Sequence, residues 1–395
     1  MSIITDPKKI DDLLTRGVFE AIDLNHLRKK LSSGKKLRIK LGIDPTSPNL
    51  HVGRSIPILK LRDFQELGHQ IVFIVGDFTG TIGDTSDKES ERPALSDDQV
   101  KMNMKTYAKQ VGKILDIDKT EVRYNSEWLS KLDYKEVCRQ ADLFSLAGFI
   151  ARKNIKQRLK AESRISLREL MYPLMQGYDS VAVEADVELG GTDQRFNLLA
   201  GREMQSYYKQ EPQDIMTNLL INGLDDRKMS SSWGNVINFL DTPKDMFGKV
   251  MSMADQMIIP YFEHCTRVPM EKVKEYENQI KDIEKHNPRD IKMELAYEIT
   301  KVYWGDKKAE EGKQNFISVI QNKEIPESIL EKKISTMNIV DALVKSELAK
   351  SKGDACRLVE QGGISIDGEK ITSVDKIVQK GEVIKKGKRF FVKAI

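Results

Sequence analysis

Two short strings of polar residues have the types and spacing needed to bind phosphate groups. The first, His51–Arg54 (His-Val-Gly-Arg), follows a turn-rich Asp-Pro-Thr-Ser-Pro segment and opens a stretch with helical apolar spacing. Backbone N–H groups at the start of such a helix bind phosphate oxygens. The second string, residues 228–232 (Lys-Met-Ser-Ser-Ser), lies among Gly and Asp residues that predict a polar loop. Each string alone is weak evidence, because short strings of this kind are usually incidental.

Three more segments contain polar side chains that the predicted elements bring together. One lies on a face of a helix, and two lie where a strand ends or a helix begins. Tyr172, Gln176 and Asp179 share one face of a predicted helix, because they are three or four residues apart. Residues 76–84 end an apolar strand, and residues 190–194 (Gly-Gly-Thr-Asp-Gln) form a tight turn before the next helix. For the first segment, the alternative is a buried helix with an incidental Asp.

The elements around these residues predict an α/β fold. Arg38–Ile43 and Gln70–Phe78 are apolar strands, and the helix Arg54–Leu67 lies between them with Gly68 as its C-cap. This strand–helix–strand unit predicts a doubly wound parallel sheet, Rossmann-like, with a nucleotide at the carboxyl ends of its strands.

Helical patterns extend beyond this unit. Ile10–Leu31 predicts an entry helix, and Ala141–Ala161 predicts a long helix in an insertion between two halves of the sheet. A further helix, Gln194–Tyr207, follows the Gly-Gly turn. From about Asp241 to Asn322 the chain is mostly helical and strongly charged.

Composition favours a globular protein in a reducing compartment. Hydrophobic residues make up 39% of the 395 residues, which is enough for a buried core. The longest apolar run, Ile71–Val75, is far too short to span a membrane, and the first ten residues contain no signal-peptide core. The 3 cysteines are scattered without pairing or metal-ligand spacing. We therefore expect a cytoplasmic protein without a membrane segment or a resident metal site.

Positive charge is concentrated at the C-terminal end of the chain. Residues 335–395 contain 12 Lys or Arg and 8 Asp or Glu, an excess that equals the net charge of +4 of the whole chain. A basic module on a neutral body predicts an anionic polymer as partner. A solvated Lys-rich tail is the alternative.

Taken together and in this order, the five polar segments resemble those of the class I aminoacyl-tRNA synthetases, and in particular the tyrosine-specific group. The helix with Tyr172, Gln176 and Asp179 carries the resemblance to the tyrosine group. The resemblance implies that L-tyrosine is activated by ATP, with Mg²⁺ accompanying the pyrophosphate, and that the tyrosyl group is then transferred to tRNA(Tyr). It also implies a homodimer formed through the inserted helices around Phe144–Leu159.

The resemblance implies a role for individual residues. Three are expected to be catalytic: His51, Arg54 and Lys228. The expected ATP contacts are Gly42, Asp44, His51, Gly53, Asp193, Lys228 and Ser231, with Asp193 on a ribose hydroxyl. The expected tyrosine contacts are Thr79, Asp84, Tyr172, Gln176, Asp179 and Gln194. In this set, Tyr172, Gln176 and Asp84 hold the ammonium group, Asp179 receives the phenolic hydroxyl, and Gln194 lies near the carboxylate.

The chain departs from the family pattern at three positions. The family usually has a second His where this chain has Arg54, and a second Lys where it has Ser231. We hypothesise that positive charge has moved from the loop to the start of the helix, with Arg54 partly replacing the missing lysine; the alternative is an Arg that points to water. Lys40 stands where one subgroup has a Tyr, so that hydroxyl contact is not expected here.

The C-terminal stretch 351–370 resembles a small RNA-binding domain shared with a ribosomal small-subunit protein. Its expected RNA contacts are Lys352 and Arg357, which would bind phosphates without reading sequence. The chain then divides into the following parts: 1–222, a Rossmann-like catalytic domain with a helical insertion at about 141–166; 223–322, the signature loop and a helical anticodon-side domain; 323–334, a linker; and 335–395, a small α+β RNA-binding domain.

Two other functions remain open at this point. The tryptophan enzyme shares the sheet and both phosphate-binding strings, although Asp179 and the terminal RNA domain argue against it. An RNA-binding protein that kept the fold but lost activation is the second, because both strings are altered. The intact tyrosine and ribose segments argue against that reading, since a non-catalytic protein has no physical need of them.

Overall fold

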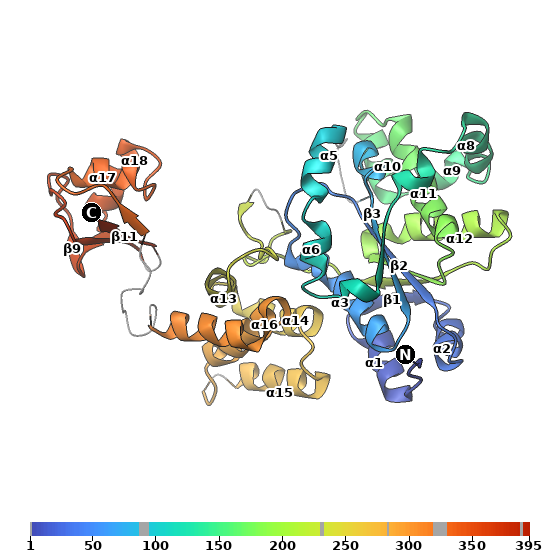
Figure 1. Cartoon of the computed structure of the whole chain (residues 1–395), viewed down its shortest axis with the longest axis horizontal. Helices are drawn as coiled ribbons and strands as arrows, with labels where there is room; N and C mark the ends of the chain where they lie inside the picture. Colours follow the sequence, from blue (N-terminus) through green and yellow to red (C-terminus); the bar gives the residue numbers. More distant parts are fainter. Residues whose placement is uncertain (1, 87–94, 230–232, 283, 319–329, 388–389) are drawn as a thin grey trace. The chain divides into compact units, whose positions relative to one another are not determined.

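The computed structural model describes residues 2–86, 95–229, 233–282, 284–318, 330–387 and 390–395. Contacts within the chain divide it into two compact units, Met1–Lys307 and Lys308–Ile395, and each is described by itself. Figure 1 shows the elements of both units in sequence colours. The finer division into four parts stays a prediction.

The first unit is built on a six-stranded sheet with the strand order β1-β6-β5-β2-β3-β4. All neighbouring strands are parallel except β1 and β6, which are antiparallel. The predicted parallel sheet is therefore confirmed, with one antiparallel edge added. The strands are β1 (Val18–Ile22), β2 (Arg38–Ile43), β3 (Gln70–Val75), β4 (Thr120–Tyr124), β5 (Val187–Gly191) and β6 (Asp214–Asn218).

Helices cover both faces of this sheet and continue beyond it (Figure 1). The helix between β2 and β3, α3 (Val52–Glu66), begins two residues earlier than the sequence predicts. The remaining helices of this part are α1 (Pro7–Thr15), α2 (Leu24–Ser32), α4 (Thr79–Ile82), α5 (Asp97–Met104), α6 (Tyr107–Val111), α7 (Ser126–Leu129), α8 (Tyr134–Ala141), α9 (Leu146–Ile150), α10 (Lys153–Lys160), α11 (Leu167–Ala182), α12 (Arg195–Tyr207), α13 (Pro243–Met251), α14 (Ile258–Cys265), α15 (Met270–Lys281) and α16 (Pro288–Phe316).

Two predicted helices are wrong. The stretch Ile10–Leu31 forms α1, β1 and α2, because Gly17 takes a φ of +63° after α1 and the chain then pairs with β6. The stretch Ala141–Ala161 forms the end of α8 and two short helices, α9 and α10. Arg152 breaks the second of these helices from the first, since its backbone is extended (φ −60°, ψ 132°).

In its described residues, the second unit contains a five-stranded sheet with the order β7-β11-β10-β8-β9 and the helices α17 and α18. It also includes the end of α16 from Lys308 onward, after the break in that helix at Gly305 (φ +76°). Apolar side chains from both layers, including Leu343, Val359 and Ile384, form its core. Its elements are β7 (Leu330–Lys332), α17 (Ile339–Lys345), α18 (Lys352–Glu360), β8 (Ile364–Ile366), β9 (Glu369–Ile371), β10 (Val383–Lys386) and β11 (Phe390–Ala394). Within the described part of the chain, no helix is both long enough and apolar enough to cross a membrane.

Candidate active site

A cavity of about 390 Å³ opens at the carboxyl ends of the parallel strands of the first unit. Its lining includes every residue that the sequence predicts for ATP or tyrosine, except Ser231, which lies outside the described residues. These lining residues are Gly42, Asp44, His51, Gly53, Arg54, Thr79, Asp84, Tyr172, Gln176, Asp179, Asp193, Gln194 and Lys228. Segments from across the first 230 residues therefore meet at one site.

One side of the cavity is formed by the first turn of α3 and the residues beside it. His51 is the N-cap residue of this helix, and its side chain does not cap the helix. Its Nδ1 is buried without a hydrogen-bond partner. Burial, with a smaller contribution from Arg54, lowers the pKa of His51 to about 4. The imidazole is therefore neutral at physiological pH, and it can donate a single N–H to a phosphate oxygen.

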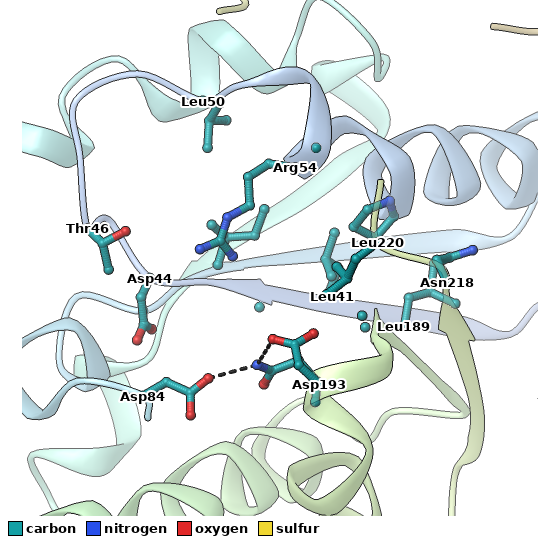
Figure 2. Close-up of a pocket in the computed structure, with 18 of the residues that line it drawn as sticks. Leu41, Asp44, Thr46, Leu50, Arg54, Asp84, Leu189, Asp193, Asn218 and Leu220 are labelled. Carbon is teal, nitrogen blue, oxygen red and sulfur yellow. Dashed lines mark hydrogen bonds between the residues drawn. The ribbon is translucent and has the colours of Figure 1, made fainter. Parts of the chain in front are cut away.

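Arg54 is exposed, yet its side chain extends over the cavity instead of away from the protein. Figure 2 shows its guanidinium in the space between Leu50 and Asp44. Among the described residues, no hydrogen bond or ion pair engages this guanidinium, although its charge lowers the pKa values of Asp44 and His51. A cation in this position is available to a bound anion.

The start of the Lys-Met-Ser string lies against the same helix. Lys228 and Met229 line the cavity, and the Lys228 carbonyl accepts a hydrogen bond of 3.1 Å from Asn235 Nδ2. Gly53 makes room for this segment: a Cβ there would lie 2.7 Å from Met229 Sδ and 3.1 Å from His51. The glycine of the first string thus allows the second string to approach it.

Asp44 joins the two sides of the cavity. Its Oδ1 accepts a hydrogen bond of 2.7 Å from Thr79 Oγ1, and its Oδ2 accepts one of 2.9 Å from Tyr172 Oη. Burial raises the pKa of Asp44 to about 6. Gly76 permits this arrangement, because a Cβ there would lie 2.1 Å from Asp44 Oδ1.

Asp179 is a buried carboxylate at the cavity wall, only 4% exposed. Its Oδ1 accepts a hydrogen bond of 2.8 Å from Trp128 Nε1, and its Oδ2 accepts one of 3.3 Å from Asn125 Nδ2. Burial raises the pKa of Asp179 to about 7, against the opposing effect of Lys40. Both oxygens still have a lone pair for a ligand hydroxyl.

Sequence reasoning missed Asn125 and Trp128. Asn125 directly follows β4, so it ends a parallel strand in the same way as Asp44 follows β2. That position is the signal that could have identified Asn125, since ligands bind outside the carboxyl ends of such strands. No comparable signal marks Trp128, whose role depends on its contact with Asp179.

A second group of polar side chains lies opposite, on the loop after β5. Gln194 Nε2 donates to Asp84 Oδ2 at 2.7 Å and to Asp193 Oδ2 at 3.1 Å. Figure 2 shows Asp84 and Asp193 close together, with these hydrogen bonds drawn as dashed lines. Ser86 donates a hydrogen bond to Asp84, and it accepts one of 3.1 Å from Arg152 of the insertion. The insertion is thereby tied to the site.

Lys40 lies in the protein core and not at the cavity surface. Its side chain is 0% exposed and does not line the cavity. Its Nζ lies 2.9 Å from Glu188 Oε1 and donates to the Gln176 carbonyl at 2.9 Å. Lys40 therefore supports α11 from within the core. Within the described ranges, no cluster of three or more His, Cys, Asp or Glu side chains could hold a metal ion.

The predicted RNA-binding residues lie on α18 of the second unit. Lys352 and Arg357 are 74% and 71% exposed in their side chains. Lys352 Nζ lies 2.8 Å from Asp341 Oδ1, and Arg357 lies 3.6 Å from Asp354 Oδ1. Exposed pairs of this kind are weak, so both cations can exchange their partners for phosphates.

Comparison with known proteins identifies the family. The family model for class I tRNA synthetases (W and Y) matches residues 32–321, and the model for the tyrosine–tRNA ligase SYY-like C-terminal domain matches residues 317–393. A tyrosine–tRNA ligase of Thermotoga maritima is 46% identical over 98% of this chain and 97% of its own length. The chain belongs to the tyrosine–tRNA ligases.

Other members of the tyrosine–tRNA ligases agree with this assignment. The Dehalococcoides mccartyi ligase is 44% identical over 98% of both chains. The first family model covers tryptophan and tyrosine enzymes alike, so the C-terminal model and the named relatives decide between them. The rival assignment to the tryptophan enzymes is therefore not supported.

Solved structures show the same fold at lower sequence identity. A truncated mitochondrial tyrosyl-tRNA synthetase from Aspergillus nidulans has a TM-score of 0.66 and 22% identity, covering 78% of this chain and 92% of that chain. The tyrosyl-tRNA synthetase of Archaeoglobus fulgidus, solved with L-tyrosine, has a TM-score of 0.61 and 22% identity, with coverages of 78% and 99%.

Proposed function

We propose that this cavity joins tyrosine to ATP and that the tyrosyl group then passes to the 3′ end of tRNA(Tyr). The observation that carries this proposal is that one cavity contains both a buried hydrogen-bond acceptor and a group of hydrogen-bond donors with a positive charge. A buried carboxylate, Asp179, lies at one wall, and the N-terminus of α3 with His51 and Arg54 lies at another. One suits a phenolic hydroxyl, and the other suits phosphates.

The amino-acid end is proposed to select tyrosine through Asp179. The phenolic hydroxyl would donate to this carboxylate, which Trp128 and Asn125 already hold in place. Phenylalanine has no hydroxyl, so its ring would leave a buried acceptor without a partner and without water. Asp84, Tyr172 and Gln176 are proposed to receive the ammonium group.

The nucleotide end is proposed to bind ATP over Gly42. That glycine is exposed in the cavity, and a Cβ built there would meet no atom within 4 Å, so a flat ligand can lie on the backbone. His51 and the amides of α3 would face the phosphates, and Asp193 would receive a ribose hydroxyl. Mg²⁺ would enter and leave with ATP and pyrophosphate as part of the substrate.

The reaction proposed for this site needs no covalent intermediate with the protein. An oxygen of the tyrosine carboxylate attacks the α-phosphorus of ATP in line. A new C–O–P bond forms, the bond from the α-phosphorus to the bridging oxygen breaks, and pyrophosphate leaves with its electrons. A terminal ribose hydroxyl of tRNA then attacks the acyl carbon, the bond from this carbon to the phosphate oxygen breaks, and AMP leaves with the hydroxyl proton on its phosphate. The side chains contribute position and positive charge.

The charges near the leaving pyrophosphate are proposed to be Lys228 and Arg54. Both line the cavity, and Arg54 makes no hydrogen bond or ion pair with another described residue. An arginine is a competent phosphate donor, so it can supply charge that the family's loop obtains from a second lysine. Ser231 is uncharged, and it lies outside the described residues.

Two surfaces outside the cavity are proposed to bind macromolecular partners, namely tRNA and a second copy of this chain. The second unit would bind tRNA through phosphate contacts by Lys352 and Arg357. A homodimer would form through the insertion, where Leu146, Ile150 and Leu159 are 62%, 40% and 48% exposed. An apolar surface of this kind is typical of an interface. We infer that the protein works in the cytoplasm.

Pyrophosphate exchange into ATP tests the proposal. We expect exchange that depends on tyrosine, and none above background with tryptophan, phenylalanine or no amino acid. Absence of exchange with tyrosine in folded protein would contradict the proposal, and it would favour an RNA-binding protein that has lost activation.

A further inference from the structure

A buried ion pair lies behind the cavity and is not part of its lining. Lys40 on β2 and Glu188 on β5 face each other directly in the parallel ladder, and they are 0% and 1% exposed. Lys40 Nζ lies 2.9 Å from Glu188 Oε1. Two charges that leave water at such a place carry a desolvation penalty, and apolar residues of similar size would often serve stability equally well. This pair therefore invites a functional explanation.

Lys40 connects this pair to the helix that carries the proposed tyrosine contacts. Besides Glu188, its ammonium group contacts the Gln176 carbonyl at 2.9 Å and Ser180 Oγ at 2.7 Å. All three donors of the ammonium group are thereby used. Gln176 and Ser180 are one turn apart on α11, and Asp179 lies between them. Lys40 thus fixes this turn of α11 against the sheet.

Glu188 determines which way the Gln176 side chain points. Glu188 Oε1 accepts a hydrogen bond of 3.1 Å from Gln176 Nε2. Its Oε2 accepts from Ser180 Oγ at 3.0 Å and from Gln213 Nε2 at 2.5 Å. An ionised carboxylate can only accept hydrogen bonds, so the Gln176 amide must turn its NH₂ group toward the core.

The oxygen of the same amide consequently faces the other way. Gln176 Oε1 accepts a hydrogen bond of 3.1 Å from Asn197 Nδ2, and Gln176 lines the cavity. An amide oxygen has two lone pairs, so it can accept one more hydrogen bond from a ligand. An ammonium group offers only donors and therefore requires the oxygen end of the amide.

We propose that Lys40 and Glu188 are positioning residues which present the Gln176 amide oxygen to the ammonium group of the bound amino acid. This inference rests on the proposed function of the cavity as a tyrosine site. Glu188 supplies the acceptor that sets the amide direction, and Lys40 makes a charged acceptor tolerable in the core. A glutamine at position 188 would fill the same space but would not dictate the direction, because its amide can donate as well as accept.

Comparing the binding of three ligands distinguishes positioning of the Gln176 amide from a purely structural role of the ion pair. Tyrosine and tyramine carry the ammonium group, whereas 3-(4-hydroxyphenyl)propionate lacks it and keeps the phenol and carboxylate. In Glu188→Gln, we expect tyrosine and tyramine to bind about tenfold more weakly, since a charged hydrogen bond is lost or misaligned. The inhibition constant of the desamino compound and the KM for ATP should change by less than about twofold.

Matched variants keep the test independent of folding. Lys40→Met alone leaves an unpaired buried carboxylate and should lower the melting temperature. The double variant Lys40→Met/Glu188→Gln removes both charges and should recover stability, while its weak binding of ammonium-bearing ligands remains. Ser180→Ala is the control, because Ser180 touches the same pair but not the Gln176 side chain. Its effect on all three ligands should be small.

Two results would overturn the inference. The first is a stable double variant that binds tyrosine and tyramine as the unmodified chain does. The second is an equal loss for all three ligands, which indicates a general distortion of the cavity. A failure of the proposed function looks different, because the unmodified chain would then show no tyrosine-dependent exchange at all.

Discussion

At the scale of single residues, the cations around the proposed phosphate end are arranged differently from the usual family strings. Arg54 occupies the position of a histidine, and its guanidinium extends over the cavity toward Asp44 (Figure 2). Beside it, His51 is neutral, because burial lowers its pKa to about 4. The helix start therefore contributes one full positive charge through Arg54 and a neutral N–H donor through His51. This arrangement fits a site that stabilises charge on phosphate mainly through Arg54 and Lys228.

Removing the Arg54 charge should slow activation. We expect Arg54→Ala to reduce the single-turnover rate of tyrosyl-adenylate formation by a factor of some tens or more. Each factor of ten corresponds to about 1.4 kcal/mol of activation free energy. The KM for tyrosine should change little, since Arg54 lies over the phosphate end. Rapid-quench measurement with excess enzyme gives the rate directly.

Arg62→Ala is the matched control for this change. Arg62 lies on the same helix, α3, but pairs with Glu66 on the surface and does not line the cavity. An unchanged single-turnover rate in Arg54→Ala, equal to that of the control, would mean that Arg54 has no part in stabilising charge.

The ionisation of Asp179 should appear in the pH dependence. Its carboxylate has a pKa of about 7, because burial disfavours the charged form. The phenolic hydroxyl is bound best by the ionised carboxylate. We therefore expect kcat/KM for tyrosine to rise with pH up to about 7 and then to level off, since this quantity reports the free enzyme.

Asp179→Asn distinguishes this carboxylate from its neighbour Asp44. Asp44 titrates with a pKa of about 6, which places its effect roughly one pH unit lower. The asparagine variant should lose the inflection near pH 7 together with much of the preference for tyrosine over phenylalanine. An inflection that survives in the variant would assign the titration to another group.

At the scale of elements, the sequence predicts those helices and strands whose signals lie within a few residues of one another. The β2–α3–β3 unit was predictable because apolar runs, a Pro-rich turn and Gly68 lie close together. Gly68 was predicted as the C-cap of α3, but the C-cap is Leu67, and Gly68 follows it with a φ of +96°. In contrast, β1 was missed because its partner, β6, follows about 200 residues later, with Val18 opposite Asn218. Gly17 marks the end of α1, but nothing in the five residues of β1 predicts a strand that pairs at that distance.

The contrast between local signals and long-range contacts applies to the site as well. The residues predicted to contact ATP or tyrosine, apart from Ser231, line one cavity. Asn125, Trp128 and Glu188 were missed, because each is a single polar or aromatic residue whose meaning depends on what packs against it. Lys40 was noted only as a departure from a motif, and its buried partners became visible only in the fold.

The contact between α3 and the loop makes a prediction about Gly53. A Cβ at this position would displace Met229 and press on His51, at 2.7 Å and 3.1 Å. We expect Gly53→Ala to lower the rate of adenylate formation by about tenfold, which corresponds to about 1.4 kcal/mol. Helical alanine is favoured over glycine by about 0.5–1 kcal/mol, so the melting temperature should rise or stay constant.

A second substitution checks the cause of this loss. Met229→Ala in the Gly53→Ala background removes the closest atom and should recover part of the activity. Parallel loss of activity and thermal stability in Gly53→Ala would instead indicate damage to α3. Thermal unfolding and the exchange assay, performed on the same samples, separate the two outcomes.

At the scale of the whole molecule, the two units divide the proposed work. Every residue proposed for ATP and tyrosine lies in Met1–Lys307, whereas the excess of positive charge lies in the second unit. Activation of tyrosine and recognition of tRNA should therefore respond to different substitutions. We therefore expect transfer to tRNA to need both units and pyrophosphate exchange to need only the first.

Neutralising the basic residues of α18 tests this division. We expect the double variant Lys352→Ala/Arg357→Ala to raise the KM for tRNA by about tenfold at low salt, because two phosphate contacts are lost. The slope of log KM against log salt should fall by about 1.5, since each contact releases roughly 0.7 to 0.9 counterions. Tyrosine-dependent exchange should stay unchanged. Glu360 is an exposed residue of the same helix, and Glu360→Ala, which removes a negative charge, should leave the KM for tRNA equal or lower. An unchanged KM and salt slope in the double variant would place tRNA binding on another surface of the molecule.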